Sequence, residues 1–263
     1  MSRVLGLLLL CFGWACPTLA NQVSVCENNE QYPPFRWYSQ TTSGEQTVQG
    51  IGLAVLQHIL DKHQWRYQIE FMPIRRCLRE VASGQQFQLM ISSSRSAERE
   101  QQYLFSDPYF YVHFSAYYLE SRFPNGIQFT DNLQLRAFRI CGINGHNFSM
   151  FDLKPENLDM GAETITGAFD KLRRGRCDVF AYNSDVVNGL KYVGWRLSDF
   201  PEIRATELSY LPKWPLVMLI SPNMPDAHRL QQTINQELAA MKQDGRLMQI
   251  IRTVYPETRE LQW

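Results

Sequence analysis

The sequence has no excess of charge of either sign, because 26 lysines and arginines balance 26 aspartates and glutamates among 263 residues. A protein that binds nucleic acid through a basic face needs a positive surplus, and so does a basic arm that binds anionic membranes. Low-complexity tracts and fixed-period repeats are also lacking, and 44% of the residues are hydrophobic, which excludes a disordered chain. We therefore expect one large domain or two of roughly 100–150 residues, with no nucleic-acid partner.

Long apolar runs are absent except at the start of the chain. Arg3 is followed by an apolar run over 4–14, and small and turn residues then lead to Ala20. This order is typical of a secretory signal peptide. The run is shorter than the roughly 20 residues that a membrane-spanning helix needs. We therefore expect residues 1–20 to be a signal peptide cleaved after Ala20, with an uncleaved membrane anchor as the alternative.

Cysteine is scarce, and Cys11 and Cys16 fall within the predicted signal peptide. The cysteines of the exported chain are then Cys26, Cys77, Cys141 and Cys177. An even number in an oxidising compartment indicates disulfides, and four cysteines allow three pairings. Their order along the chain favours Cys26–Cys77 and Cys141–Cys177, with four reduced thiols as the alternative. No C-x-x-C spacing occurs and no histidine is placed to complete a zinc site, so no metal is expected.

The apolar pattern alternates between strand-like and helix-like segments. Over the first hundred residues it predicts strands at 22–26, 67–72 and 87–91 and helices at 53–65 and 74–81. A second, smaller unit follows, with strands at 138–143 and 177–182 and a helix at 166–174. The last predicted elements are a strand at 216–221 and helices at 225–241 and 246–254. This alternation is typical of α/β units, in which helices cover the faces of a parallel sheet.

Two extended segments, near 112–120 and 213–221, connect these units. They predict two lobes joined by a double-strand hinge, with residues 21–115 and 216–263 in the first lobe and 116–215 inserted as the second. Each lobe is expected to be an α/β unit with a mainly parallel sheet. Because ligands of open α/β sheets bind beyond the carboxyl ends of the strands, the expected binding site is a cleft between the lobes.

Several short motifs carry a resemblance to a known family. They are S-R-S-A-E-R at 94–99 with F-S-D-P-Y at 105–109, Y-P-P-F at 32–35, G-R-C-D at 175–178 and K-Q-D-G-R-L at 242–247. Together they resemble the family 3 extracytoplasmic solute-binding proteins, the periplasmic receptors of polar amino acid ABC transporters. The resemblance implies the two-lobed fold of type II periplasmic binding proteins and a periplasmic location. It also implies a monomer without cofactors, whose partner is an ABC permease or a membrane sensor.

Arg99 is the main candidate for binding the ligand. A guanidinium can bind a carboxylate through two parallel hydrogen bonds. Ser96, three residues earlier, shares its face if it caps a short helix. The resemblance implies that Arg99 binds the carboxylate of the ligand, with Ser92, Ser94 and Ser96 beside it. A solvated arginine in a charged run is the alternative.

Three other residues are candidates for the walls of the cleft. The resemblance implies that the ring of Tyr32 packs on the ligand side chain. Asn147 falls in a second-lobe loop whose backbone N–H groups suit an anion. Arg76 could point a second positive charge into the cleft, or it could lie on the surface of its predicted helix.

Two positions depart from what the resemblance implies. Family members that bind α-amino acids carry acidic residues where this chain has Asn29 and Asn183. Glu27, Glu30 or Asp185 could replace them after a small shift, and Asp185 is the best placed. Without such a carboxylate, an ammonium would be buried among neutral acceptors, which is unfavourable.

The sequence therefore predicts capture of a small polar carboxylate-bearing ligand, in the first instance an amino acid, for an ABC transporter. A soluble sensory protein that partners a signalling receptor is the alternative. A dehydratase-type enzyme on the same fold would need an acid–base group in the cleft, for which the candidates are Asp185, Glu30 and His146. His146 is nevertheless expected on the surface, and neither a nucleophile elbow nor a phosphate-binding loop is present.

Overall fold

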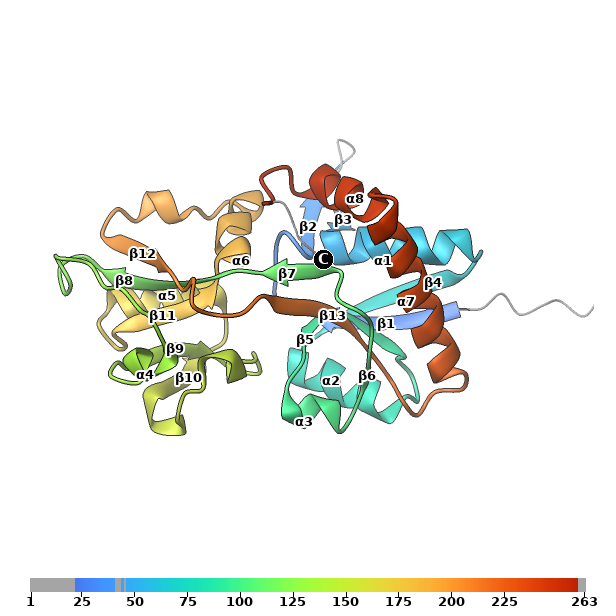
Figure 1. Ribbon diagram of the computed structural model, residues 1–263, viewed down its shortest axis with the longest axis horizontal. Helices are drawn as coiled ribbons and strands as arrows, with labels where there is room; N and C mark the ends of the chain where they lie inside the picture. Colours follow the sequence, from blue (N-terminus) through green and yellow to red (C-terminus); the bar gives the residue numbers. More distant parts are fainter. Residues whose placement is uncertain (1–21, 41–43, 45, 260–263) are drawn as a thin grey trace, which may run out of the picture.

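The computed structural model describes residues 22–40, 44 and 46–259, and the predicted signal peptide lies outside this part of the chain. The described residues form two lobes, each built on a β-sheet with helices against it (Figure 1). A separate two-stranded hairpin of β2 (Trp37–Gln40) and β3 (Gln46–Gln49) belongs to neither large sheet. The chain is thus an α/β protein with two lobes, as the sequence predicts.

The sheet of the first lobe combines strands from distant parts of the chain, in the order β4-β1-β5-β13-β6, with β7 also paired to β13. Its strands are β1 (Gln22–Asn28), β4 (Arg66–Met72), β5 (Leu89–Ser94), β6 (Leu104–Phe105), β7 (Phe110–Val112) and β13 (Trp214–Ile220). Its helices are α1 (Ile51–Lys62), α2 (Ile74–Ser83), α3 (Ala97–Glu100), α7 (Ala227–Gln243) and α8 (Arg246–Val254). Helices α1, α7 and α8 lie on one side of the sheet and α2 and α3 on the other (Figure 1).

The sheet of the second lobe has the order β10-β9-β11-β8-β12. Its strands are β8 (Phe114–Leu119), β9 (Ile140–Ile143), β10 (Leu158–Ala162), β11 (Val179–Asn183) and β12 (Ile203–Glu207). The α-helices of this lobe are α4 (Asn132–Leu135), α5 (Ile165–Arg173) and α6 (Ser184–Gly189). Short 3-10 helices add Ser149–Phe151, Pro155–Asn157, Leu190–Val193 and Leu197–Asp199.

Both sheets are mixed, so the prediction of mainly parallel sheets is wrong. Strand β1 runs parallel to β4 and β5, and β9 runs parallel to β10 and β11. Strand β13, however, is antiparallel to β5, and β8 is antiparallel to β11. The physical reason is that β8 and β13 enter their sheets from the opposite lobe, whereas the parallel strands follow helices of their own lobe.

The two connections between the lobes lie side by side (Figure 1). The aromatic run 109–119 is divided at His113, because β7 pairs with β13 in the first sheet and β8 pairs with β11 in the second. The chain returns from β12 to β13, which begins at Trp214. These two crossings form the double-strand hinge, while the predicted lobe boundaries at 115/116 and 215/216 stay a prediction.

Strands β10 and β12 were not predicted, and both are edge strands of the second sheet. Their residues are largely exposed or only partly buried, so the sequence has no strong apolar signal there. The predicted helix 246–254, in contrast, matches α8 at both ends. Buried strands and amphipathic helices are therefore predictable here, and polar edge strands are not.

Both predicted disulfides are present. Cys26 of β1 is bonded to Cys77 of α2, with the two Cα atoms 5.6 Å apart. Cys141 of β9 is bonded to Cys177, which comes just before β11, with the Cα atoms 5.5 Å apart. Each bond joins two elements of a single lobe, which confirms the predicted pairing.

Candidate functional site

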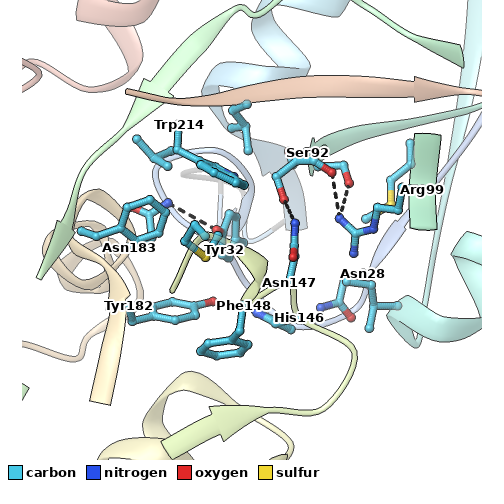
Figure 2. A pocket seen from close by; sticks show the side chains of 18 of the residues that line it. Asn28, Tyr32, Ser92, Arg99, His146, Asn147, Phe148, Tyr182, Asn183 and Trp214 are labelled. Carbon is cyan, nitrogen blue, oxygen red and sulfur yellow. Dashed lines mark hydrogen bonds between the residues drawn. The ribbon is translucent and has the colours of Figure 1, made fainter. Parts of the chain in front are cut away.

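A pocket lies between the two lobes, at the carboxyl ends of strands β1, β5 and β11 (Figure 2). This is the position at which open α/β sheets bind ligands. The empty space in and around this pocket is about 740 Å³, a volume that includes open solvent. The first lobe contributes Arg99, and the second contributes the segment 146–148.

Arg99 reaches the pocket from α3, and its position is fixed by its neighbours. Ser96 caps this helix, since its Oγ accepts a hydrogen bond from the backbone N–H of Arg99 at 3.3 Å. The Nη1 of Arg99 donates to Ser93 Oγ at 3.0 Å and to the carbonyl oxygen of Ser94 at 3.1 Å. Burial lowers the pKa of the guanidinium. No carboxylate of the described residues lies within ion-pair distance of Arg99, so this cation has no counter-ion of its own.

A second buried arginine in the pocket wall does have a counter-ion. Arg36 Nε lies 3.4 Å from Glu27 Oε2, and both side chains are almost fully buried. Glu27 Oε1 also accepts hydrogen bonds from the backbone N–H groups of Ile91 at 2.6 Å and Ser92 at 2.8 Å. Burial raises the pKa of Glu27, against the opposing effects of Arg36 and these N–H groups. The two charges compensate each other within the first lobe.

The wall opposite Arg99 is neutral and hydrogen-bonded. Asn183 Nδ2 donates to the hydroxyl oxygen of Tyr32 at 3.3 Å, which links the lobes (Figure 2). Asn183 Oδ1 accepts from the backbone N–H groups of Asp185 and Val186 at 2.9 and 3.2 Å, so Asn183 caps α6. Burial raises the pKa of Tyr32 to about 12, and this hydroxyl therefore stays protonated at neutral pH. The amide at position 183 thus turns an N–H group, and not an oxygen, towards the pocket.

His146 lies in the pocket wall with its side chain 10% exposed, so the prediction that it lies on the surface is wrong. Its Nδ1 is 2.8 Å from the hydroxyl of Tyr182, and its Nε2 is 3.5 Å from Glu30 Oε2. Glu30 Oε1 also accepts from the backbone N–H of Ile165, the first residue of α5, at 2.7 Å. A first-lobe carboxylate thereby occupies the N-terminus of a second-lobe helix, where a negative charge is stabilised.

The lobes touch on both sides of the pocket. Asn147 Nδ2 donates to Ser94 Oγ and to the carbonyl oxygen of Arg95, each at 2.9 Å. Gly189 packs so closely on the first lobe that a Cβ there would lie 2.6 Å from the Pro33 carbonyl group. Only a residue without a side chain fits this approach. The structure therefore has the lobes closed around the pocket.

Six of the nine predicted ligand-binding residues line the pocket. They are Tyr32, Ser92, Ser94, Arg99, Asn147 and Asn183. Both lobes contribute to this set, so the fold brings together residues up to about 150 positions apart, such as Tyr32 and Asn183. Asn28, at the end of β1, lines the pocket, whereas Asn29 does not.

The other three predicted residues do not line the pocket. Arg76 lies on the surface of α2, with its side chain 59% exposed and its Nε 3.7 Å from Glu80 Oε1, one helical turn away. Ser96 contacts Arg99 as a helix cap and does not face the cavity. Asp185 is turned towards the hinge, where its Oδ2 accepts from the backbone N–H of His113 at 2.9 Å. Each of these three side chains contacts a neighbouring residue of the protein and does not line the pocket.

Five aromatic side chains that line the pocket were not predicted from the sequence. Besides Tyr32, the rings in its lining belong to Phe114, Phe148, Phe151, Tyr182 and Trp214. The Nε1 of Trp214 is buried and has no hydrogen-bond partner among the described residues. Most of these rings come from strand ends or from the hinge, where aromatic residues are equally typical of a hydrophobic core. Their role in the pocket could not be separated from core packing by sequence alone.

The part of the chain that the structure describes has no cluster of three or more potential metal-ligating side chains. In the same ranges, no helix has the length and apolar character to span a membrane.

Comparison with known proteins identifies the chain at the level of its family. Residues 25–257 match the model of the bacterial extracellular solute-binding proteins, family 3. No curated protein matches the sequence. Solved structures match at low identity, which shows a shared fold.

One is a putative binding component of an ABC transporter from Wolinella succinogenes complexed with lysine, at 17% identity and a TM-score of 0.69, covering 91% of this chain and 98% of that one. Another is an amino acid ABC transporter substrate-binding protein from Streptococcus pneumoniae bound to L-arginine, at 16% identity and a TM-score of 0.67, covering 90% and 95%. A third is an ancestral amino acid-binding protein described as a precursor of cyclohexadienyl dehydratase, at 16% identity and a TM-score of 0.66, covering 89% and 96%.

Proposed function

This chain belongs to family 3 of the bacterial extracellular solute-binding proteins, and we propose that it captures a small carboxylate-bearing solute between its lobes for delivery to an ABC permease. The proposal includes export to the periplasm, cleavage after Ala20 and action as a monomer. The ligands of the solved neighbours, lysine and L-arginine, also carry a carboxylate. A membrane sensor in place of the permease is the alternative partner.

The observation that carries the proposal is the uncompensated charge of Arg99. Both hydrogen bonds of its guanidinium use Nη1, and the Nε and Nη2 groups donate to none of the described residues. Burying a cation without a counter-ion is costly, and an arginine fork pairs best with a carboxylate. A bound carboxylate would supply the missing counter-ion and would lie beside the serines at the end of β5.

Closure of the lobes would complete the site. Asn147 joins the second lobe to Ser94 and Arg95, next to Arg99. A solute held by Arg99 and covered by the second lobe would be shielded from water, which strengthens its ion pair with the guanidinium. The permease would then recognise the closed form, whose population the solute increases.

The test is ligand binding to the exported chain and to Arg99→Ala. A thermal-shift screen of amino acids, their decarboxylated amines and their deaminated acids identifies the solutes that bind, and calorimetry then measures their Kd values. We expect Arg99→Ala to weaken binding of a carboxylate solute by about 100-fold or more. Arg76→Ala, which removes an arginine from the exposed face of α2, is the matched control and should leave the Kd unchanged. Equal affinity in wild type and Arg99→Ala would refute carboxylate capture by this residue.

A further inference from the structure

We infer that the pocket selects a carboxylate that carries no ammonium group and has an apolar body, an inference that rests on the proposed function. A pocket for an α-amino acid needs acceptors for the ammonium as well as donors for the carboxylate. In this chain the amide and carboxylate oxygens of the pocket are already used, whereas several donors are free, and Ser92 Oγ, which has no partner among the described residues, is a neutral group that can donate or accept. The expectation of an amino acid ligand is revised for this reason.

The three asparagines that line the pocket all use their side-chain oxygens on backbone N–H groups. Asn183 Oδ1 accepts two, from Asp185 and Val186. Asn28 Oδ1 accepts from Glu30 at 3.3 Å, and Asn147 Oδ1 accepts from Ser149 at 3.0 Å. A flipped amide would place NH₂ against N–H in each case, so these contacts fix the orientation. The amides therefore present N–H groups to a ligand more readily than oxygens.

The carboxylates near the pocket are also engaged. Glu27 is the one carboxylate among the lining residues, and it is paired with Arg36 and with two backbone N–H groups. Glu30 contacts Ile165 and His146, and Asp185 contacts His113. None of the three carboxylates that could have replaced the missing acidic residues is thus available to an ammonium without breaking a contact described here.

The charges of the pocket lead to the same conclusion. Glu27 and Arg36 compensate each other, which leaves one positive charge, that of Arg99, among the acidic and arginine side chains in the lining. A monocarboxylate neutralises this charge. A zwitterion would add a positive group that has no carboxylate partner, at a cost that an ammonium-free acid avoids.

Two hydrogen-bond donors besides Arg99 favour a ligand that carries further oxygen atoms. Trp214 Nε1 is buried without a partner among the described residues. The hydroxyl oxygen of Tyr32 already accepts from Asn183, so its proton is available to a ligand acceptor. The rest of the lining is largely aromatic or aliphatic, which suits an apolar body with a 2-oxo or carboxylate oxygen near these donors.

The experiment compares matched probes that differ in one group. The probes are L-phenylalanine, phenylpyruvate, 3-phenylpropanoate and 2-phenylethylamine, with L-leucine, 4-methyl-2-oxopentanoate and 4-methylpentanoate as an aliphatic set. Calorimetry on the exported chain, freed of ligand by unfolding and refolding, gives each Kd. We expect at least one ammonium-free acid to bind tenfold or more tightly than its amino acid, and the amine not to bind.

Asn183→Asp tests the mechanism. Aspartate can still cap α6, but it replaces the N–H group that faces Tyr32 with a charged oxygen. This variant should shift the affinity ratio towards the amino acid by about tenfold. Asn188→Asp adds the same charge at an exposed position on α6 outside the pocket lining, and should leave the ratio unchanged.

The outcomes separate this inference from the proposed function. If an amino acid binds more tightly than its deaminated acid, and Arg99→Ala abolishes that binding, the inference is overturned and carboxylate capture by Arg99 stays in place. Binding of the acids that is unchanged in Arg99→Ala would refute the proposed function. Binding of none of the acids at 10 mM would overturn the ligand class inferred here.

Discussion

Each lobe has one disulfide, and in each a carboxylate follows one of the bonded cysteines and contacts arginine. In the first lobe Glu27 follows Cys26 and pairs with Arg36. In the second lobe Asp178 follows Cys177 and pairs with Arg139, which donates to it through its backbone N–H, Nε and Nη2. The surroundings differ, since the side chain of Glu27 is 1% exposed and that of Asp178 is 13% exposed.

The pKa values of these two carboxyl groups move in opposite directions. Burial raises the pKa of Glu27 more than Arg36 and the backbone N–H groups lower it. The hydrogen bonds from Arg139 lower the pKa of Asp178 more than its smaller burial raises it. An arginine neighbour therefore does not decide the direction by itself. The depth of burial does, and it also separates a charge pair in the pocket wall from a more exposed cluster in which Asp178 contacts Arg139, just before β9, and Arg122, just after β8.

The largest expected effect is on stability in Glu27→Ala. This change removes the acceptor of the Ile91 and Ser92 N–H groups and leaves Arg36 buried without a counter-ion, which should lower the free energy of unfolding by about 3–5 kcal/mol. In Asp178→Asn the loss should stay below about 1 kcal/mol, because solvent screens that pair. Urea unfolding at pH 7 measures both values. Equal losses in the two variants would contradict the difference in burial on which the comparison rests.

Removal of a disulfide should affect the two lobes almost equally. The cysteines of the first bond are 51 residues apart and those of the second are 36 apart. Because the entropy of loop closure depends on the logarithm of loop length, replacing either pair by serine should cost about 2–4 kcal/mol, with a difference of roughly half a kcal/mol or less. Denaturant unfolding of the two double variants measures this, and a difference above about 2 kcal/mol would show that loop length is not the main determinant.

A smaller effect is expected from the contact of Glu30 with α5. Glu30→Ala removes the acceptor of the Ile165 N–H across the cleft, and a lost cap costs about 1 kcal/mol. Because the contact joins the lobes, the cost should appear as a roughly fivefold weaker affinity for the solute, measured by calorimetry. Glu30→Gln keeps an acceptor oxygen and should retain most of the affinity. Equal weakening in both variants would show that the negative charge of Glu30, and not the hydrogen bond to Ile165, determines the effect.

The smallest effect is on the pH dependence of stability, with opposite signs for the two carboxylates. The folded-state pKa of Glu27 lies above its ordinary value of 4.5, so the free energy of unfolding should fall as the pH rises from 4.5 through that higher pKa. The folded-state pKa of Asp178 lies below 3.8, so stability should fall as the pH drops from 3.8 through the lower pKa. Unfolding measured from pH 3 to pH 7 should lose the first slope in Glu27→Gln and the second in Asp178→Asn. If a variant keeps the pH dependence assigned to the carboxylate that it lacks, another titrating group causes that dependence.

Much of the fold and part of the pocket followed from local sequence. The S-R-S-A-E-R segment predicts the cap at Ser96 and the position of Arg99, because both depend on residues three apart on one short helix. Arg76 was ambiguous for the opposite reason. Its helix is amphipathic whichever way the arginine points, and only the packing of α2 places it beside Glu80 on the exposed face.

By itself the sequence determined the alternation of strands and helices, the two lobes, the disulfide pairs and the arginine that reaches the cleft. The alternation and the lobes depend on periodicity, the disulfide pairs on the order of the cysteines along the chain, and the position of Arg99 on the motif that resembles the family. Tertiary structure alone decided that Trp214, Tyr182 and His146 meet at the pocket and that Asp185 turns to the hinge. It also decided the directions of the pKa shifts and the hydrogen-bond partners of the asparagines. The reason is that burial and hydrogen-bond pairing are set by segments that are distant in the chain and become neighbours only when two sheets close on each other.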